Sequence, residues 1–323
     1  MNTYKNILTR YIPILIYSFI LASMLFVISV SDSASAANII VNGRSDAAVA
    51  GEGYCTLREA IKNANSDSDT TGGDCIAGSG ADTITFSVSG TITLRSNLPG
   101  ITSSDGLTID GGNAITISGN NAVRIFFVSS GSVFTLQNIT VAKGSAYGVG
   151  GGIWNDQGIL TIKNSTFSNN SAEYEGGGIY SYQGIVTVKN STFSNNGVGW
   201  GGGIYNDQGA LEVTGSTFYG NQGGYESEGA GIYNNGTAII TNSIFSENSA
   251  DIGGGGIMNL QGTVPLRNTI LANNYGGNCS GTITDGGGNL SSNSSCKFSA
   301  PDSRNNINAG LGPVDLKNRG SKE

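Results

Sequence analysis

Residues 151–196 read GGIWNDQGILTIKNSTFSNNSAEYEGGGIYSYQGIVTVKNSTFSNN, which is one segment written twice with few changes. Three more copies follow, and each copy begins with a Gly-Gly-Ile-like step whose isoleucines are spaced by 26, 25, 28 and 25 residues. A fixed period in this range is the signature of a solenoid, in which stacked repeats share one continuous core. The isoleucines are Ile153, Ile179, Ile204, Ile232 and Ile257.

Each copy also ends in the same way, with an apolar residue followed three positions later by asparagine. This second set of anchors keeps a similar period, so the whole segment repeats and not only its first residues. The pairs are Phe167/Asn170, Phe193/Asn196, Phe218/Asn221, Phe245/Asn248 and Leu271/Asn274.

Within a copy the apolar residues alternate, as in residues 158–162 (GILTI) and 184–188 (GIVTV). Alternation with period two and an abundance of β-branched residues indicate strands. A copy of this length accommodates three short strands and their turns, but no additional helix. The sequence therefore predicts an all-β parallel β-helix whose coils are about 4.8 Å apart.

A recurring turn asparagine suggests a ladder of stacked amides. It occupies Asn138, Asn164, Asn190, Asn242 and Asn268, and Gly215 replaces it in one coil. Because asparagine amides can bond to one another and to turn backbone, we expect this ladder to point inward and to satisfy buried polar groups.

The chain divides into four expected segments: an export signal (1–36), an N-terminal cap (37–81), the coils (82–300) and a polar tail (301–323). In the first segment Lys5 and Arg10 precede an apolar run over 11–30, and the segment ends in Ala34-Ser35-Ala36, which suits signal peptidase. The apolar run is also long enough for an uncleaved anchor, the one route by which we expect membrane contact.

Four cysteines in an exported chain indicate two disulfides. Of three possible connectivities we expect Cys55–Cys75 and Cys279–Cys296, because each closes a local loop at one end of the solenoid. The cysteines lack the close spacing of metal ligands, and there is no histidine, so no metal site and no cofactor are expected. The net charge of −7 without a basic cluster argues against nucleic-acid binding.

Residues 56–59 (TLRE) form a capping box, which predicts a short amphipathic helix over 56–64. Such a helix would cover the open apolar end of the first coil.

Residues 55–61 (CTLREAI), followed by 82–86 (DTITF), resemble the CSLREA motif of secreted right-handed β-helix proteins, with Thr56 in place of the usual serine. The repeats are also similar to those of chlamydial-type polymorphic outer-membrane proteins. The resemblance implies a right-handed, single-stranded parallel β-helix of the pectin-lyase-like fold, at the cell surface or secreted, with no general enzymatic activity. The polar residues 314–323 depart from the family pattern.

Because the same fold hosts polysaccharide lyases and glycoside hydrolases, catalysis is a real alternative. The absence of histidine excludes Ser-His-Asp and Cys-His mechanisms. A glycosidase needs two carboxylates, and Asp156 and Asp207 occupy matching positions two coils apart, with Tyr182 between them. Each aspartate lies in an Asp-Gln-Gly turn, which accounts for it without catalysis.

An aromatic row is the stronger candidate for a binding site. Trp154, Tyr180, Tyr205 and Tyr233 each follow an inward isoleucine, so they should point outward in one stack that ends at Met258. The preceding loops add Tyr147, Tyr174, Trp200 and Tyr225. Such rings either bind sugars or a protein partner or simply stabilise the sheet. The same loops carry acidic residues expected to be a solvated edge, with weak calcium binding as the alternative: Glu173, Glu175, Glu226, Glu228 and Asp251.

Together these patterns predict a monomeric, secreted or cell-surface protein of adhesion type. Its expected partner is a polysaccharide or a surface protein, bound by Trp154, Tyr180, Trp200, Tyr205 and Tyr233. The alternative is a polysaccharide lyase or glycoside hydrolase that uses Asp156 and Asp207.

Overall fold

The computed structural model describes residues 35–197, 199–308 and 310. All but the last two residues of the expected export signal, and residues 311–323 of the expected tail, lie outside the described residues. In the described part of the chain, no helix is both long and apolar enough to cross a membrane.

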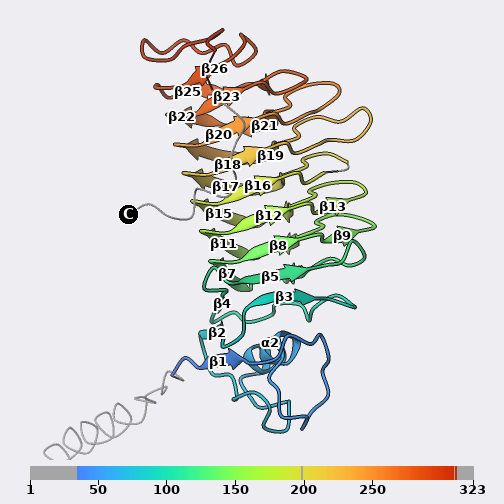
Figure 1. Ribbon diagram of the computed structural model, residues 1–323. Coiled ribbons are helices and arrows are strands. Elements are labelled where there is room, and N and C mark those ends of the chain that lie inside the picture. The colour runs from blue at the N-terminus through green and yellow to red at the C-terminus, as the bar shows by residue number, and fades with distance from the viewer. Residues whose placement is uncertain (1–34, 198, 309, 311–323) are drawn as a thin grey trace, which may run out of the picture. The chain divides into compact units, whose positions relative to one another are not determined.

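The described residues form stacked coils, with every strand pair between coils parallel (Figure 1). A sheet of 15 strands contains the first two strands of each regular coil. These strands are β1 (Asn38–Val41), β2 (Asp82–Phe86), β4 (Leu107–Asp110), β6 (Phe126–Val128), β7 (Val133–Gln137), β10 (Ile153–Asp156), β11 (Ile159–Lys163), β14 (Ile179–Tyr182), β15 (Ile185–Lys189), β17 (Ile204–Thr214), β19 (Ile232–Thr241), β21 (Ile257–Thr263), β22 (Pro265–Arg267), β24 (Cys279–Gly281) and β25 (Thr284–Asp285).

A second sheet of nine strands contains the third strand of each coil, and a short sheet of two strands lies beside it. The nine strands are β3 (Gly90–Thr93), β5 (Ile115–Ser118), β8 (Thr140–Ala142), β12 (Thr166–Ser168), β16 (Thr192–Ser194), β18 (Thr217–Tyr219), β20 (Ile244–Ser246), β23 (Ile270–Ala272) and β26 (Leu290–Ser291). The two short strands are β9 (Ser145–Ala146) and β13 (Ser171–Ala172). The predicted all-β parallel β-helix is thus confirmed.

Both sets of predicted anchors form the core. The repeated isoleucines and the residues of the Phe/Leu set are fully buried. The phenylalanines stack ring on ring: the centroids of Phe167, Phe193, Phe218 and Phe245 are 4.8, 4.9 and 4.7 Å apart in turn. Offset stacking adds stabilisation beyond the burial of apolar surface.

The asparagines predicted to line the core point outward instead. Asn164 and Asn190 are exposed, with positive φ of 47° and 49°, and Gly215 in the matching position has φ 62°. Asparagine and glycine share this site because both tolerate the left-handed conformation. An outward hydrogen bond of 3.2 Å joins Asn164 Nδ2 to Asn138 Oδ1.

The inward ladder is formed by the asparagine at the end of each copy. Asn170, Asn196, Asn221, Asn248 and Asn274 are buried. Each link repeats one pattern: the backbone N–H and the side-chain amide of Asn170 both donate to Asn196 Oδ1, at 3.0 and 2.9 Å. Asn196 Nδ2 donates in turn to Asn221 Oδ1 at 3.0 Å. The ladder satisfies backbone and side-chain groups that have no access to water.

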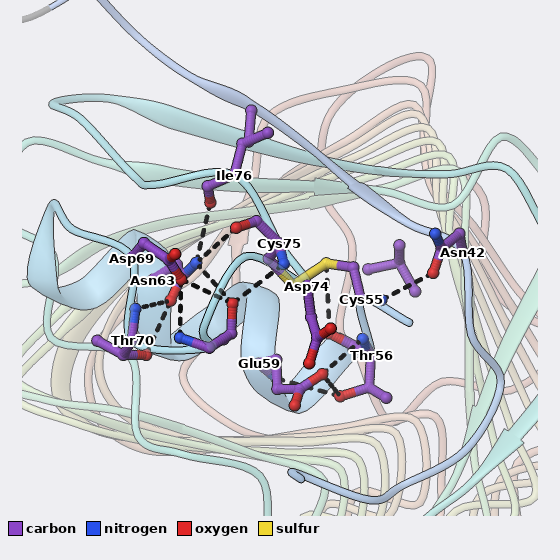
Figure 2. Close-up of a disulfide and its surroundings, with 12 residues drawn as sticks. Asn42, Cys55, Thr56, Glu59, Asn63, Asp69, Thr70, Asp74, Cys75 and Ile76 are labelled. Carbon is purple, nitrogen blue, oxygen red and sulfur yellow. Dashed lines mark hydrogen bonds between the residues drawn. A yellow bond between two sulfur atoms is a disulfide. The ribbon is translucent and has the colours of Figure 1, made fainter. Parts of the chain in front are cut away.

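The predicted helix covers the first coils. Helix α2 (Leu57–Ser66) begins after Thr56, whose side chain forms the predicted capping box with Glu59 (Figure 2). Leu57, Ala60, Ile61 and Ala64 are buried against the core. Because β1 pairs with β2, the large sheet already begins at residue 38, inside the segment expected to be a cap.

Both predicted disulfides are present, Cys55–Cys75 beside helix α2 (Figure 2) and Cys279–Cys296 at the other end of the coils. Arg58 secures the helix further by an ion pair of 2.7 Å with Asp46. The guanidinium also donates to the backbone oxygens of Ser96 and Asn97. A charge pair so well shielded from water is expected to hold the cap in register with the coils.

A carboxylate fastens the last described segment to the final coil, which predicts acid sensitivity. Partial burial alone would raise the pKa of Asp285, but donors from Ala300, Ser303 and Asn289 outweigh it and lower the pKa from 3.8 to about 2. Because the folded pKa lies below the ordinary value, the stabilisation is complete above pH 3.8 and is lost as the pH falls through about 2.

We expect the backbone amides of Ser299 and Ala300, which donate to Asp285 Oδ2 at 2.7 and 2.6 Å, to lose protection from hydrogen exchange over that pH range. The Asp285→Asn variant should lack this transition, whereas Asp105→Asn, at an exposed carboxylate, should retain it. Protection that persists at the lowest pH in the unmodified chain would contradict the assignment.

Candidate functional site

The predicted aromatic row exists as a stack of side chains on neighbouring strands. Tyr205 and Tyr233 are closest, with ring centroids 4.6 Å apart and planes 10° from parallel. The centroids of Tyr180 and Tyr205 are 5.4 Å apart. The residues in register along the row are Trp154, Tyr180, Tyr205, Tyr233 and Met258.

Much of this row is nevertheless covered, so the prediction that it is exposed is wrong. Tyr205 and Tyr233 are only 7% and 5% exposed. The loop that precedes β17 places the Trp200 ring over Tyr233, with centroids 6.2 Å apart and planes 15° from parallel. The strand aromatics thus form a packed layer beneath the loops, and a ligand meets the loop residues first.

Trp154, at one end of the row, already makes a cation–π contact with the side chain of Arg124. The Arg124 guanidinium lies 4.9 Å from the centre of its ring, and Phe127 packs at 4.9 Å. Arg124 also donates to the backbone oxygens of Val149 and Gly150. Burial lowers the pKa of Arg124. These contacts make Trp154 part of the structural support and leave little of it for a sugar.

Six of the exposed apolar residues lie in the loops along one edge of the stack, which Figure 1 shows beside β9 and β13. The loop before each Gly-Gly-Ile-like step carries one large apolar residue, and so does the loop before β24, so that the series continues from coil to coil. We call this series the loop row: Tyr147, Tyr174, Trp200, Tyr225, Ile252 and Tyr275, which are 85, 54, 43, 88, 61 and 65% exposed.

Backbone hydrogen bonds between loops hold part of this row in register. The Tyr174 N–H donates to Gly148 O at 3.0 Å, and the Trp200 N–H donates to Tyr174 O at 2.7 Å. Gly199 allows this close approach: its φ is 78°, and a Cβ there would lie 1.7 Å from Tyr174 O. The row is therefore fixed to the ladder of coils.

A groove of about 620 Å³ lies among these loops. Its aromatic lining consists of Tyr174, Trp200 and Tyr225, and Ile252 adds an aliphatic side chain. Four carboxylates share the same space: Glu173, Glu175, Glu226 and Glu228. We call these the groove glutamates.

The groove has a negative potential. Burial, and secondly the charge of Asp207, raise the pKa of Glu175. In the layer beneath, burial raises the pKa of Tyr180, and the charges of Asp207 and Glu175 add to the effect. Burial also raises the pKa of Tyr205, and the charges of Glu175 and Asp207 add to that rise. A cation that enters this space would relieve the repulsion.

The two aspartates weighed for catalysis lie as the register predicts: Asp156 pairs with Tyr182, which pairs with Asp207. Asp207 accepts hydrogen bonds from the Tyr180 hydroxyl at 3.2 Å and from Asn235 Nδ2 at 2.8 Å. Asp156 accepts from Gln157 Nε2 at 3.2 Å. Neither aspartate lines the groove, although Asp207 belongs to the layer below it through its bond to Tyr180. Across the described ranges no three Asp, Glu, Cys or His side chains gather as metal ligands.

A family model described as "Right handed beta helix region" matches residues 124–300. The chain belongs to this family. Comparison with curated proteins and comparison with solved structures gave no match. The family confirms the predicted right-handed β-helix. The matched residues include every coil that borders the groove.

The sequence identified Trp200 and the other loop aromatics, but the main role in ligand binding was assigned to the aromatic residues on the strands: Trp154, Tyr180, Tyr205 and Tyr233. Ile252 and Tyr275 were overlooked as continuations of the loop row. The signal was present, because one large apolar residue recurs in otherwise Gly- and Ser-rich loops.

Proposed function

We propose that this right-handed β-helix protein is a non-catalytic surface protein of adhesion type that binds glycans along the loop row. The exposed apolar residue on each successive coil is the observation that supports this function. A monomeric soluble protein seldom exposes such a continuous apolar series without using it. Aromatic rings held rigidly in a groove suit the flat apolar faces of sugar rings.

Secretion or display at the cell surface is part of the proposal. Two disulfides persist in oxidising compartments outside the cytosol, and the N-terminal sequence has the pattern of an export signal. The CSLREA-like motif at residues 55–61 supports the same location by resemblance.

The Tyr225→Ala change tests the binding surface. Tyr225 is 88% exposed, so its loss should leave thermal stability nearly unchanged. We expect retention on a glycan array to weaken about tenfold, because one stacking platform is lost. Tyr54→Ala provides the matched control, since Tyr54 is 59% exposed but lies in the N-terminal cap. Equal effects of both changes, or none, would argue against this surface.

Polysaccharide cleavage is the second candidate, and one observation favours it. Glu175 has a raised pKa, as a general acid requires, while Asp207 acts on it as a neighbouring negative charge. Release of oligosaccharide by the purified protein, abolished by Glu175→Gln and by Asp207→Asn, would establish this function in place of adhesion.

A further inference from the structure

The groove on the loop edge suggests a chemical class of ligand as well as a location. We infer that it binds a linear polysaccharide whose sugar rings carry free amino groups and are therefore cationic. This inference rests on the proposed function and adds the charge and shape of the glycan to it.

The shape of the site fits a linear polymer. The loop row places one apolar side chain on each of six successive coils, and coils are about 4.8 Å apart, so the row extends over roughly 24 Å. One coil step is close to the length of one sugar residue in an extended chain. A stiff polymer could thus present ring after ring to the row without bending.

Trp200 shows how one sugar residue would be held. Behind it lies the Tyr233 ring at 6.2 Å, so the tryptophan plane is fixed from one side. Its Nε1 donates to the backbone oxygen of Glu226 at 3.3 Å, which fixes its rotation. With 43% of the residue still exposed, Trp200 offers a preorganised platform.

The charge of the site selects for a cation. The loops at 171–177, 199–203, 222–231 and 249–256 contain five acidic residues and no lysine or arginine. The two ion pairs that the described residues form, Arg58–Asp46 and Lys189–Glu212, include none of the groove glutamates. No lysine or arginine of the described residues therefore pairs with these carboxylates, which leaves them available to a cationic ligand, and the aromatic faces beside them add cation–π attraction.

An amino sugar satisfies both features at once. Each ring provides an apolar face for stacking and an ammonium group at its edge, within reach of glutamates that flank the aromatic residues. A lysine-rich peptide would satisfy the charge, but it offers no succession of flat faces to a row of rings one coil apart. A neutral or acidic glycan would leave the carboxylates unpaired or repelled.

Calorimetric titration with two glucosamine hexamers tests the inference, because one carries free amines and the other is fully N-acetylated. We expect the free amine form to bind at least about tenfold more tightly, and sodium chloride to weaken it. The Glu226→Gln/Glu228→Gln variant should lose about tenfold in affinity and most of the salt dependence. Glu52→Gln, at an exposed site in the cap, is the matched control.

The outcomes separate the two levels of the proposal. Equal or tighter binding of the N-acetylated hexamer, reduced by Tyr225→Ala, would refute the cationic ligand but retain glycan binding. No binding of either hexamer, together with no retention on the glycan array, would refute both. Tighter binding of a lysine hexamer than of the glucosamine hexamer, with the same dependence on Glu226 and Glu228, would identify a basic peptide and overturn the inference.

Discussion

The Asn196→Ala change is expected to destabilise the protein by about 4 kcal/mol, because it leaves buried donors without an acceptor. Asn196 Oδ1 accepts from both the backbone N–H and the side-chain amide of Asn170. Its own amide donates to Phe167 O at 2.9 Å and to Asn221 Oδ1 at 3.0 Å. Alanine supplies none of these bonds, and water has no access to replace them because Asn196 is 0% exposed.

Chemical denaturation of the purified protein measures this effect, and Asn164→Gly is the matched control. Asn164 repeats with the same period but is exposed and has φ 47°, a conformation that glycine adopts freely. Its replacement should change stability by less than about 1 kcal/mol. A larger loss at Asn164 than at Asn196 would reverse the assignment of the inward and outward ladders.

This pair of positions shows what could be predicted from the sequence and what could not. Periodicity identified both recurring asparagines, the stacking of the coils and the core anchors. It could not distinguish the inward from the outward asparagine, because both recur once per coil. The distinguishing signal was substitution: glycine replaces the outward asparagine at Gly215 and never replaces the inward one in the regular coils. An exchange of Asn for Gly marks a left-handed backbone, and not a buried amide.

The candidate site was predicted in part for a similar reason. Alternation along the strands correctly placed Tyr205 and Tyr233 outside the core and in register. Alternation cannot predict whether another layer covers an outward residue, and here the glycine-rich loops bring Trp200 over Tyr233. The exposed side chains are therefore those of the loop row, whereas Tyr205 and Tyr233 on the strands are buried. The alternation along a strand determines the direction in which a side chain points, whereas the path of the loops determines whether a ligand can reach it.

The Phe193→Ala change is expected to destabilise the protein by about 4 kcal/mol, since it removes a fully buried ring from the centre of a stack. Phe193 lies between Phe167 and Phe218, with centroid separations of 4.8 and 4.9 Å. Both neighbours would lose a stacking partner, and the backbone ladders above and below prevent the coils from closing the cavity. The loss should be measured by chemical denaturation, with hydrogen exchange to locate it in the affected coils.

Phe193→Leu distinguishes volume from ring stacking at this position. In the next coil along the chain, Leu271 stands in register with Phe245, so a leucine fits this core geometry. We expect the leucine variant to lose only about 1 to 2 kcal/mol, because most of the buried volume is kept and the stacking contribution alone is removed. Equal losses for alanine and leucine would mean that ring stacking, more than the filling of space, holds neighbouring coils together.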